Sequence, residues 1–450
     1  MPMAIKNREN KVTDQPHNIV IVGGGAGGLG LATKLGKKLG KKKKAHITLV
    51  DAQKTHFWKP LLHEVAAGSL NAFEDELSYL AQAKWNHFQF LPGRMSGLNR
   101  DNKTITLAPI YDETGEEVVP ERNLEYDDLV ICVGSTANDF NTPGAVDHCL
   151  FLDNREEAER VHTTLLNHYL YAQASREASP ELNIAIIGAG ATGVELAAEL
   201  HHAAIELARY GLDAIKPNKV KITIIEGSDR ILPALPIRIS SSVHKQLQKM
   251  GILIQTNQLV SEITNTGLKT KSGDIIASDL SIWAAGIKAP AFLKDIAGLE
   301  TNRINQLLVK PTLQSTLDDH IYALGDCASC TLKDSNDEPI TIPPRAQAAH
   351  QQAELLAKSL IGNVLEGQAP LTFTYKDYGS LISLSRFSAV GNLMGAITGG
   401  DMMVEGMMAK MFYISLYRMH QVALFGRFRT GSLILKDFIG KTTRPHLKLH

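Results

Sequence analysis

Two groups of three glycines have a spacing that suits phosphate binding. Gly23, Gly25 and Gly28 follow the apolar run 18–22 and precede a helical pattern. In a G-x-G-x-x-G loop the first glycine allows a tight turn, the second lets the backbone approach a pyrophosphate, and the third lets helix and strand pack closely. The helix N-terminus then favours the negative charge. The alternative is a glycine-rich turn of another α/β fold.

The same pattern returns in the second half of the chain. The apolar run 183–187 leads into Gly188, Gly190 and Gly193, and a second helical pattern follows. The repetition predicts two dinucleotide-binding sites in one chain.

An acidic residue ends the next β-type run in each half, Asp51 in the first and Glu226 in the second. An acid at this position accepts a hydrogen bond from a ribose hydroxyl. Both acids lie further from the first glycine than the roughly 20 residues that are typical of the motif. Insertions at 37–44 and 210–218 explain the longer spacing.

Three later apolar runs also end in small residues: 128–133 before Gly134, 280–285 before Gly286, and 321–324 before Gly325-Asp326. Glycine at the carboxyl end of a strand lets the backbone pass close to a bound nucleotide. Together the runs predict an α/β fold with two Rossmann-like dinucleotide-binding domains.

Length and charge limit the function classes. A chain of 450 residues has room for two or three domains. Its formal net charge of zero predicts no general attraction to nucleic acid. The first 16 residues are polar, which argues against a secretory signal, and no uncharged apolar run reaches the length that spans a bilayer. Four cysteines are too few for a disulfide framework, so a reducing compartment is expected.

The segment 36–44 carries six lysines. A solvated connection between helix and strand is the simpler interpretation. Attraction to an anionic membrane surface is the functional alternative, because clustered lysines gain about 1 kcal/mol each near such a surface.

With its late Gly325-Asp326 pair, the chain resembles the two-dinucleotide flavoprotein oxidoreductases, which have a glutathione-reductase-like fold. The resemblance implies that the first glycine-rich unit binds FAD, that Asp326 binds the FAD ribitol, and that the second unit binds NADH. It also implies a division of the chain. The expected parts are a flexible tail (1–16), FAD-binding segments (17–150 and 300–395), an NADH-binding domain (151–299) and a C-terminal membrane-association segment (396–450).

The positions of the cysteines bear on the type of oxidoreductase. Dithiol reductases of this superfamily carry a redox-active pair after the first acidic strand, and residues 52–90 contain no cysteine. Cys327 and Cys330 form a C-x-x-C directly after Asp326. Packing or a solvent-facing thiol pair is the favoured interpretation, over a metal or redox role.

Several segments are similar to the bacterial type II NADH dehydrogenases: 58–65, 283–286, 343–352, 375–380 and 417–420. The resemblance implies a single-subunit respiratory-chain enzyme that transfers hydride from NADH to FAD. Two electrons then pass to a membrane quinone, ubiquinone or menaquinone, without proton pumping. It also implies a peripheral protein on the cytoplasmic face of the inner membrane, and it leaves a homodimer open.

Four side chains are candidates for the reaction site, and the resemblance places one of them, Glu195, there. Lys59 would lie near the flavin ring, or simply in a packed loop. Gln347 and His350 lie near the start of a helix and would face a flavin edge, or only decorate that helix. Glu195 would lie beside the nicotinamide as a proton conduit. Alternatively it completes a capping box with Thr192.

Two other functions are compatible with the sequence. A sulfide:quinone oxidoreductase shares the fold but needs cysteines at the flavin, and Glu226 with a complete second glycine-rich loop favours a nicotinamide donor. A redox-sensing flavoprotein would bind both nucleotides without quinone turnover.

Between 407 and 423 apolar residues recur at helical spacing, with Lys410 and Arg418 largely on the other side. A second apolar segment includes 433–435 and 438–439. From 401 to 450 there are eight Lys and Arg against three Asp and Glu. This pattern predicts amphipathic helices that lie in a membrane interface, and a core-facing helix pair or a dimer interface is the alternative.

Overall fold

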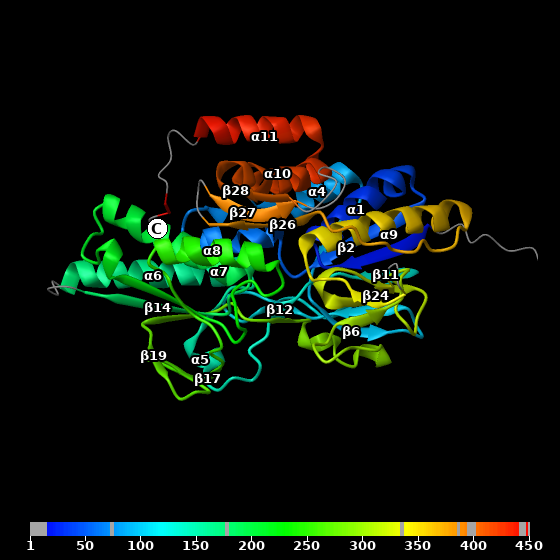
Figure 1. Ribbon diagram of the computed structural model, residues 1–450. Coiled ribbons are helices and arrows are strands. Elements are labelled where there is room, and N and C mark those ends of the chain that lie inside the picture. Colours follow the sequence, from blue (N-terminus) through cyan, green and yellow to red (C-terminus); the bar gives the residue numbers. More distant parts are fainter. Residues whose placement is uncertain are drawn as a thin grey trace, which may run out of the picture.

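The computed structural model describes residues 16–72, 76–175, 180–333, 337–384, 388–393, 402–440 and 447–448. Within these ranges the chain forms two five-stranded parallel sheets with helices packed on them (Figure 1). The predicted tail, apart from residue 16, lies outside the described residues, as do the side chains of 438–439.

The first sheet has the strand order β23-β11-β1-β2-β5. Its strands are β1 (His17–Val22), β2 (Ala45–Asp51), β5 (Gln89–Pro92), β11 (Asp128–Ile131) and β23 (Ile321–Ala323), and all are parallel. Helices α1 (Ala26–Lys38) and α9 (Ala346–Glu366) pack side by side on it. Because β23 pairs with β11, the chain returns to this sheet after it has built the second one.

The second sheet has the order β13-β20-β14-β15-β16 and is also parallel. Its strands are β13 (Leu150–Phe151), β14 (Leu182–Ile187), β15 (Val220–Ile225), β16 (Leu253–Gln255) and β20 (Leu280–Trp283). Isoleucine and leucine side chains from its central strands fill a separate core. Strands buried on both faces read as continuous apolar runs, which is the pattern in the sequence. The two sheets confirm the predicted fold class.

Smaller elements connect and flank the sheets. The strands β12 (Thr136–Ala137) and β21 (Ile287–Lys288) form an antiparallel pair. They lie in the two chain segments that connect the first sheet with the second. The other antiparallel strand groups are β3 (Thr55–His56) with β4 (Leu77–Ser78), β6 (Met95–Asn99) with β7 (Thr104–Leu107) and β10 (Arg122–Glu125), β8 (Ile110–Tyr111) with β9 (Glu117–Val119), and β17 (Val260–Thr264) with β18 (Gly267–Thr270) and β19 (Ile275–Ala277). A mixed sheet contains β22 (Leu307–Val309), β24 (Ala328–Lys333) and β25 (Pro339–Thr341). In the described part of the chain before the C-terminal segment, the other α-helices are α2 (Leu62–Ala66), α4 (Tyr79–Asn86), α5 (Ala145–His148), α6 (Arg155–Ser175), α7 (Ala191–Arg209) and α8 (Ile237–Lys249).

The C-terminal segment forms a layer over one side of the molecule. An antiparallel sheet of β26 (Gly379–Ser383), β27 (Ala389–Leu393) and β28 (Met402–Glu405) leads into α10 (Gly406–Phe425) and α11 (Arg427–Gly440). Figure 1 shows α10 on this sheet and α11 outermost. The helices are separated by Gly426, whose φ is +80°. Among the described residues, no helix has both the length and the apolar character needed to cross a membrane.

Candidate functional site

Two loops of the same shape follow the central strands β1 and β14. Gly23 and Gly188 both have a φ of +104°. A Cβ on Gly23 would overlap the carbonyl oxygen of Cys132, and a Cβ on Gly188 would lie 2.7 Å from the Cα of Ala285. Only glycine satisfies both the backbone conformation and the close approach, so these two positions are fixed by the fold.

The other glycines of the two loops also have matching surroundings. A Cβ on Gly28 or Gly193 would overlap the carbonyl oxygen of the first glycine in its own loop. A Cβ on Gly25 or Gly190 meets no atom within 4 Å, and no side chain caps α1 or α7. The N–H groups of both first turns are therefore available to an anion, so both loops fit the pyrophosphate of a dinucleotide.

The two predicted ribose-binding acids hold equivalent positions. Asp51 accepts a hydrogen bond from the backbone N–H of Gly24 at 2.6 Å, and Glu226 accepts one from Ala189 at 2.7 Å. In each case the other carboxylate oxygen accepts from the N–H two residues further along the chain. Burial raises the pKa of Asp51, although these hydrogen bonds act in the opposite direction. Each acid thus ties its glycine loop to the neighbouring strand, beside the place where a nucleotide would lie.

Three segments of the first sheet meet at Asp326. The Lys59 ammonium donates to the carbonyl oxygen of Ser135 at 2.8 Å, and the Ser135 hydroxyl donates to Asp326 at 2.9 Å. Gly134 precedes this serine with a φ of +72°, and a Cβ there would meet no atom within 4 Å. The structure therefore brings together Lys59, Gly134 and Asp326, which lie far apart in the sequence.

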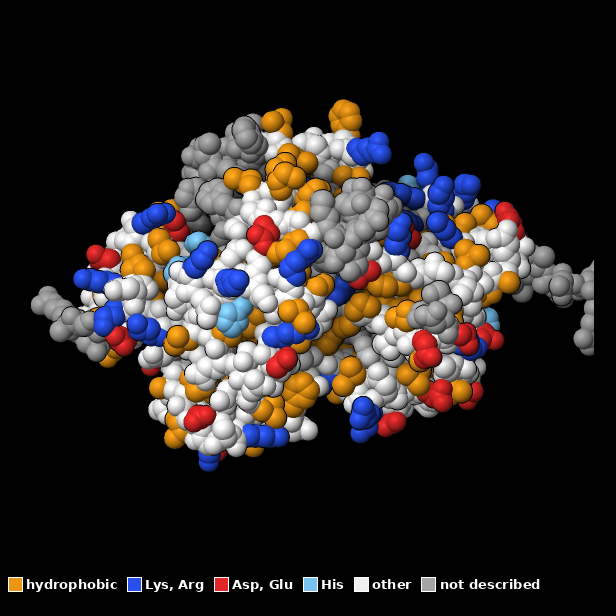
Figure 2. All heavy atoms as spheres, in the orientation of Figure 1, with side chains coloured by type: hydrophobic (Ala, Val, Ile, Leu, Met, Phe, Trp, Pro, Cys, Tyr) orange, Lys and Arg blue, Asp and Glu red, His pale blue; other side chains and the backbone are white. Residues whose placement is uncertain are grey.

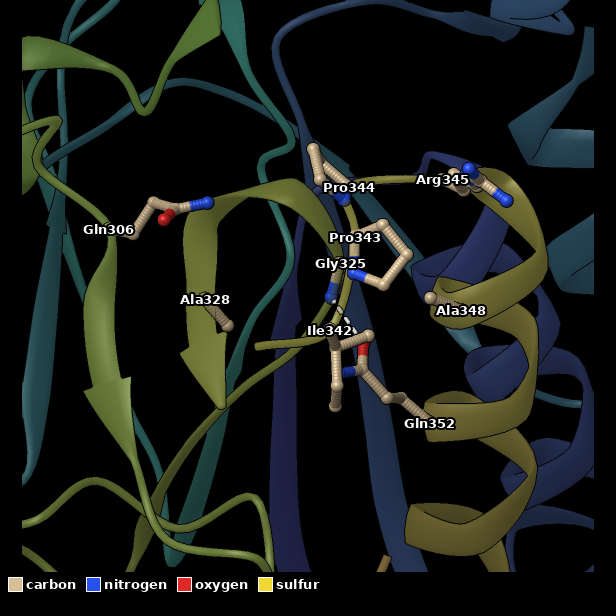
Figure 3. A pocket seen from close by; sticks show the side chains of 9 residues that line it. All are labelled: Gln306, Gly325, Ala328, Ile342, Pro343, Pro344, Arg345, Ala348 and Gln352. Carbon is tan, nitrogen blue, oxygen red and sulfur yellow. Dashed lines mark hydrogen bonds between the residues drawn. The ribbon is translucent and has the colours of Figure 1, made fainter. Parts of the chain in front are cut away.

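Hydrogen bonds fix the turn that contains Gly325 and Asp326, and Figure 3 shows the one between Gly325 and Gln352. The N–H of Gly325 donates to the Gln352 side chain at 2.8 Å, and the Gln306 amide donates to the Asp326 carbonyl oxygen at 2.8 Å. A cavity of about 10 Å³ lies beside this turn, which is room for one water molecule and not for a cofactor. The lining residues are Gln306, Gly325, Ala328, Ile342, Pro343, Pro344, Arg345, Ala348 and Gln352. This cavity supports the backbone of the site and is not itself the binding site.

Glu195 is buried among polar groups, and the capping-box alternative is wrong. Helix α7 begins at Ala191 with Gly190 as its N-cap, so Thr192 already lies inside the helix. Glu195 is 6% exposed and accepts a hydrogen bond from the backbone N–H of Ser383 at 2.8 Å. The Glu195 side chain therefore hydrogen-bonds to a distant buried segment and does not cap its own helix.

Around Glu195 the side chains of His63, Glu64, Glu199 and Lys410 form what we call the carboxylate cluster. The His63 Nδ1 lies 3.6 Å from the Glu195 carboxylate, and the Lys410 ammonium lies 3.8 Å from Glu64. Burial raises the pKa of Glu195 to about 8 and lowers the pKa of His63 to about 3. Glu195 therefore holds a proton near neutral pH while His63 is neutral, which makes Glu195 a potential proton donor.

The two predicted residues on α9 contact different neighbours. The helix begins at Ala346, close to its predicted start after Pro344. The Gln347 side-chain oxygen accepts from the Tyr375 hydroxyl at 3.2 Å. His350 instead lies 3.1 Å from His420, in a separate group of rings. Within the described residues, Gln347, His350 and Glu195 are not joined to one another by a direct hydrogen bond.

His350, His420 and His56 form a continuous row of hydrogen bonds, which we call the histidine cluster. His56 Nδ1 lies 2.9 Å from the Gly24 carbonyl oxygen, and His56 Nε2 lies 2.9 Å from His420 Nε2. Because a carbonyl oxygen only accepts, the neutral tautomers follow: His56 donates to Gly24, His420 donates to His56, and His350 donates to His420. The Trp58 ring stacks on His420, with 4.1 Å between centroids.

Lys410 and His420 take part in these clusters although their roles were not predicted from the sequence. Lys410 was expected on the polar side of an amphipathic helix, but it is 8% exposed and donates to the Ser383 hydroxyl at 2.7 Å. One signal in the sequence could have indicated their burial: the polar side of this helix combines one lysine and one histidine with tyrosines, which are partly apolar. The apolar side of α10 is exposed, and its polar side, with Lys410 and His420, is buried against the protein.

Gly286 and the two cysteines of the C-x-x-C pack against other parts of the protein. Gly286 has a φ of +64°, and a Cβ there would overlap the Phe140 ring. Cys327 and Cys330 are both buried and unbonded to one another, so a solvent-facing thiol pair is wrong and packing is the better interpretation. Burial raises the pKa of Cys327 to about 12, which keeps its thiol protonated and unreactive.

The chain is similar in sequence to a known family of oxidoreductases. Residues 17–353 match the family model described as pyridine nucleotide-disulphide oxidoreductase. The chain is 45% identical over 447 residues to a type II NADH:quinone oxidoreductase of Haemophilus influenzae, and the match covers 96% of this chain and 100% of the relative.

Solved structures also share the fold, and two of them are similar over nearly the whole chain. NDH2 of Plasmodium falciparum, solved in complex with NADH, superposes with a TM-score of 0.79 at 20% identity, covering 96% of this chain and 100% of that one. The sulfide:quinone oxidoreductase of Aquifex aeolicus gives a TM-score of 0.72 at 16% identity, covering 95% of this chain and 96% of that one. At these identities the structures establish the architecture alone.

Proposed function

The chain belongs to the pyridine nucleotide-disulphide oxidoreductase family and, within it, to the type II NADH:quinone oxidoreductases, and on this basis we propose how its residues serve that activity. The observation that carries the proposal is the pair of matching glycine loops on two parallel sheets, each with an acid on its loop. Two dinucleotides bound to one chain are what hydride transfer from NADH to a flavin requires.

We assign the first loop to FAD and the second to NADH. In the first, Gly23, Gly25 and Gly28 would hold the pyrophosphate, Asp51 a ribose hydroxyl, and Asp326 the ribitol chain, with Lys59, Gly134 and Gln347 closer to the ring. In the second, Gly188, Gly190, Gly193, Glu226 and Gly286 would hold NADH. The flavin would supply the chemistry that passes a hydride from NADH and two electrons to a quinone, while these residues would hold and orient the two nucleotides. The sheet that returns through β23 supports this assignment, because the chain places Asp326 back beside the first loop.

NADH is the proposed donor over NADPH. In this assignment Glu226 would accept a hydrogen bond from the adenosine 2′-hydroxyl and would repel a 2′-phosphate. Arg230, the arginine nearest to Glu226 in the sequence, donates to the carbonyl oxygens of Leu235 at 2.9 Å and Pro233 at 2.7 Å. Its guanidinium is therefore already engaged. Comparable kcat/KM values for NADH and NADPH would contradict this proposal.

The second substrate in this proposal is a membrane quinone. Apolar side chains of α10 are exposed, among them Met407, Met408, Met411 and Met419 at 60–66%. An amphipathic helix with this face exposed binds a membrane interface, here on the cytoplasmic side. Beneath it, Glu195, Gln347 and His350 would supply protons and hold the quinone head group.

Steady-state NADH oxidation by the FAD-loaded protein tests the activity. We expect turnover that depends on a soluble quinone analogue, and anaerobic NADH should bleach the flavin absorbance before quinone is added. Bleaching without quinone turnover would indicate a redox sensor. Quinone-dependent turnover driven by sulfide instead of NADH would indicate a sulfide:quinone oxidoreductase.

A further inference from the structure

A lysine cluster at the C-terminal end of α1 has no part in the proposed reaction. It consists of Lys37, Lys38, Lys41, Lys42, Lys43 and Lys44, and all six residues are exposed. The segment 26–44 that carries them contains no acidic residue. Because like charges at this density repel one another, the cluster favours an anionic partner.

Backbone packing holds the lysine cluster in a defined position. A Cβ on Gly36 would overlap the carbonyl oxygen of Asn86, and a Cβ on Gly40 would overlap that of His87. The turn that carries the lysines therefore lies directly against the end of α4. Their side chains project from a structured surface next to that helix.

The same end of α4 contacts the start of α11. The guanidinium of Arg429 lies over the Trp85 ring, 4.5 Å from its centroid, and the Phe425 ring lies 6.5 Å from the same tryptophan. Partial desolvation of the exposed Lys37 lowers its pKa, and the charge of Arg429 contributes to the shift. The lysine cluster and the start of α11 thus belong to one positive surface.

Apolar side chains border this positive surface. Phe428 is 94% exposed and stands between Arg427 and Arg429. Figure 2 shows exposed apolar side chains at the top of the molecule and a dense group of basic side chains at the upper right, where α1 ends. Basic residues beside exposed aromatic and aliphatic side chains suit a lipid interface, whereas nucleic acid offers no apolar layer for Phe428 to enter.

We propose that the lysine cluster binds the anionic headgroups of phospholipids in the membrane on which α10 and α11 rest. The inference rests on the membrane association in the proposed function, and it adds a requirement for lipid charge. It also fixes an orientation, because the apolar helices and the lysine cluster must reach the same lipid surface. Each lysine close to an anionic surface strengthens binding about fivefold.

Co-sedimentation of the full-length, FAD-loaded protein with vesicles tests the proposal. One set of vesicles contains phosphatidylcholine alone, and the other contains phosphatidylcholine with phosphatidylglycerol. The test variant carries Lys41→Gln, Lys42→Gln and Lys44→Gln. It retains Lys43 because that residue has a φ of +53°, where a substitution could disturb the backbone of the turn. The matched control carries Lys269→Gln, Lys271→Gln and Lys294→Gln, which remove three exposed charges elsewhere.

We expect the wild-type protein and the control to prefer the anionic vesicles. The test variant should bind them roughly 10- to 100-fold more weakly, yet bind neutral vesicles as the wild type does. Equal binding of the test variant and the wild type to anionic vesicles would overturn the proposal, as would a wild type that does not distinguish the two lipids. NADH oxidation with a soluble quinone analogue, measured on the same samples, reports separately on the proposed function.

Discussion

Helix α10 contributes one residue to each of two buried polar clusters of opposite character. Near its start, Lys410 enters the carboxylate cluster with Glu64, Glu195 and His63. Ten residues later, His420 joins the histidine cluster. In the carboxylate cluster a buried ammonium group balances nearby carboxylates. The histidine cluster is an uncharged row of imidazole rings, and the Gly24 carbonyl oxygen fixes the tautomer of each ring.

The difference shows two ways to attach an amphipathic helix to a protein. Buried charges need partners, because an unpaired ion in the interior costs several kcal/mol. Neutral imidazoles need only hydrogen bonds, but each ring must keep the tautomer that its neighbour requires. The two clusters should therefore respond to mutation and to pH in opposite ways.

The largest expected effect is the loss of the buried cation. Lys410→Met leaves the carboxylate cluster without its ammonium and should lower the free energy of unfolding by about 3–5 kcal/mol at pH 8. The loss should be smaller at pH 5, because protonated carboxyl groups need no cation. Thermal unfolding at both pH values measures it.

Lys34→Met is the matched control for this variant. Lys34 pairs with Glu354 at the surface, where an ion pair contributes about 1 kcal/mol or less. Equal destabilisation by the two substitutions, or a loss that does not depend on pH, would show that Lys410 packs without balancing charge.

The second effect is kinetic and separates catalysis from stability. Glu195→Gln keeps the hydrogen bond from Ser383 but removes the transferable proton, so kcat for quinone reduction should fall about 100-fold. Flavin bleaching by NADH should persist. With a pKa of about 8, the donor is protonated below that pH, and the wild-type rate should decline above it.

Glu199→Gln, one turn further along α7, serves as the control for Glu195→Gln. It removes a neighbouring buried carboxyl group whose charge helps to raise the pKa of Glu195, so the decline at high pH should persist but begin at a somewhat lower pH. A Glu195→Gln enzyme with normal turnover and an unchanged pH profile would exclude Glu195 as the proton donor.

The smallest effect concerns acid stability of the histidine cluster. Burial lowers the pKa of His56 to about 4, whereas histidine in an unfolded chain titrates near 6.5. The unfolded chain therefore binds more protons between these values, and stability falls as the pH decreases. This single residue should contribute a loss of about 2 kcal/mol between pH 6.5 and 5.

His56→Gln retains a donor for Gly24 and an acceptor for His420, and it should flatten the acid decline by that amount. Melting temperatures at pH 5 and pH 7 give the comparison, with the exposed His148→Gln as control. Glu195 has the opposite sign: its raised pKa lets the folded chain bind more protons between pH 4.5 and 8, so its contribution to stability decreases as the pH rises. An identical acid decline in His56→Gln and wild type would refute the neutral-cluster model.

The sequence by itself determined the two glycine loops and their acids. A G-x-G-x-x-G loop depends on φ values and close approaches within a few residues, and apolar runs mark the adjoining strands. Both are local properties, so the order of residue types along the chain suffices to place Gly23, Gly188, Asp51 and Glu226. The helical spacing of apolar residues likewise predicted the apolar side of α10.

Only the tertiary structure decided which polar groups meet beneath α10. His56 and His420 are 364 residues apart in sequence, yet they share a hydrogen bond. Thr192 and Glu195 matched a local capping pattern, but the helix begins earlier and its packing buries Glu195. Contacts between distant segments depend on how whole elements pack, and the pKa values that suit Glu195 and the histidines to their roles arise from that burial.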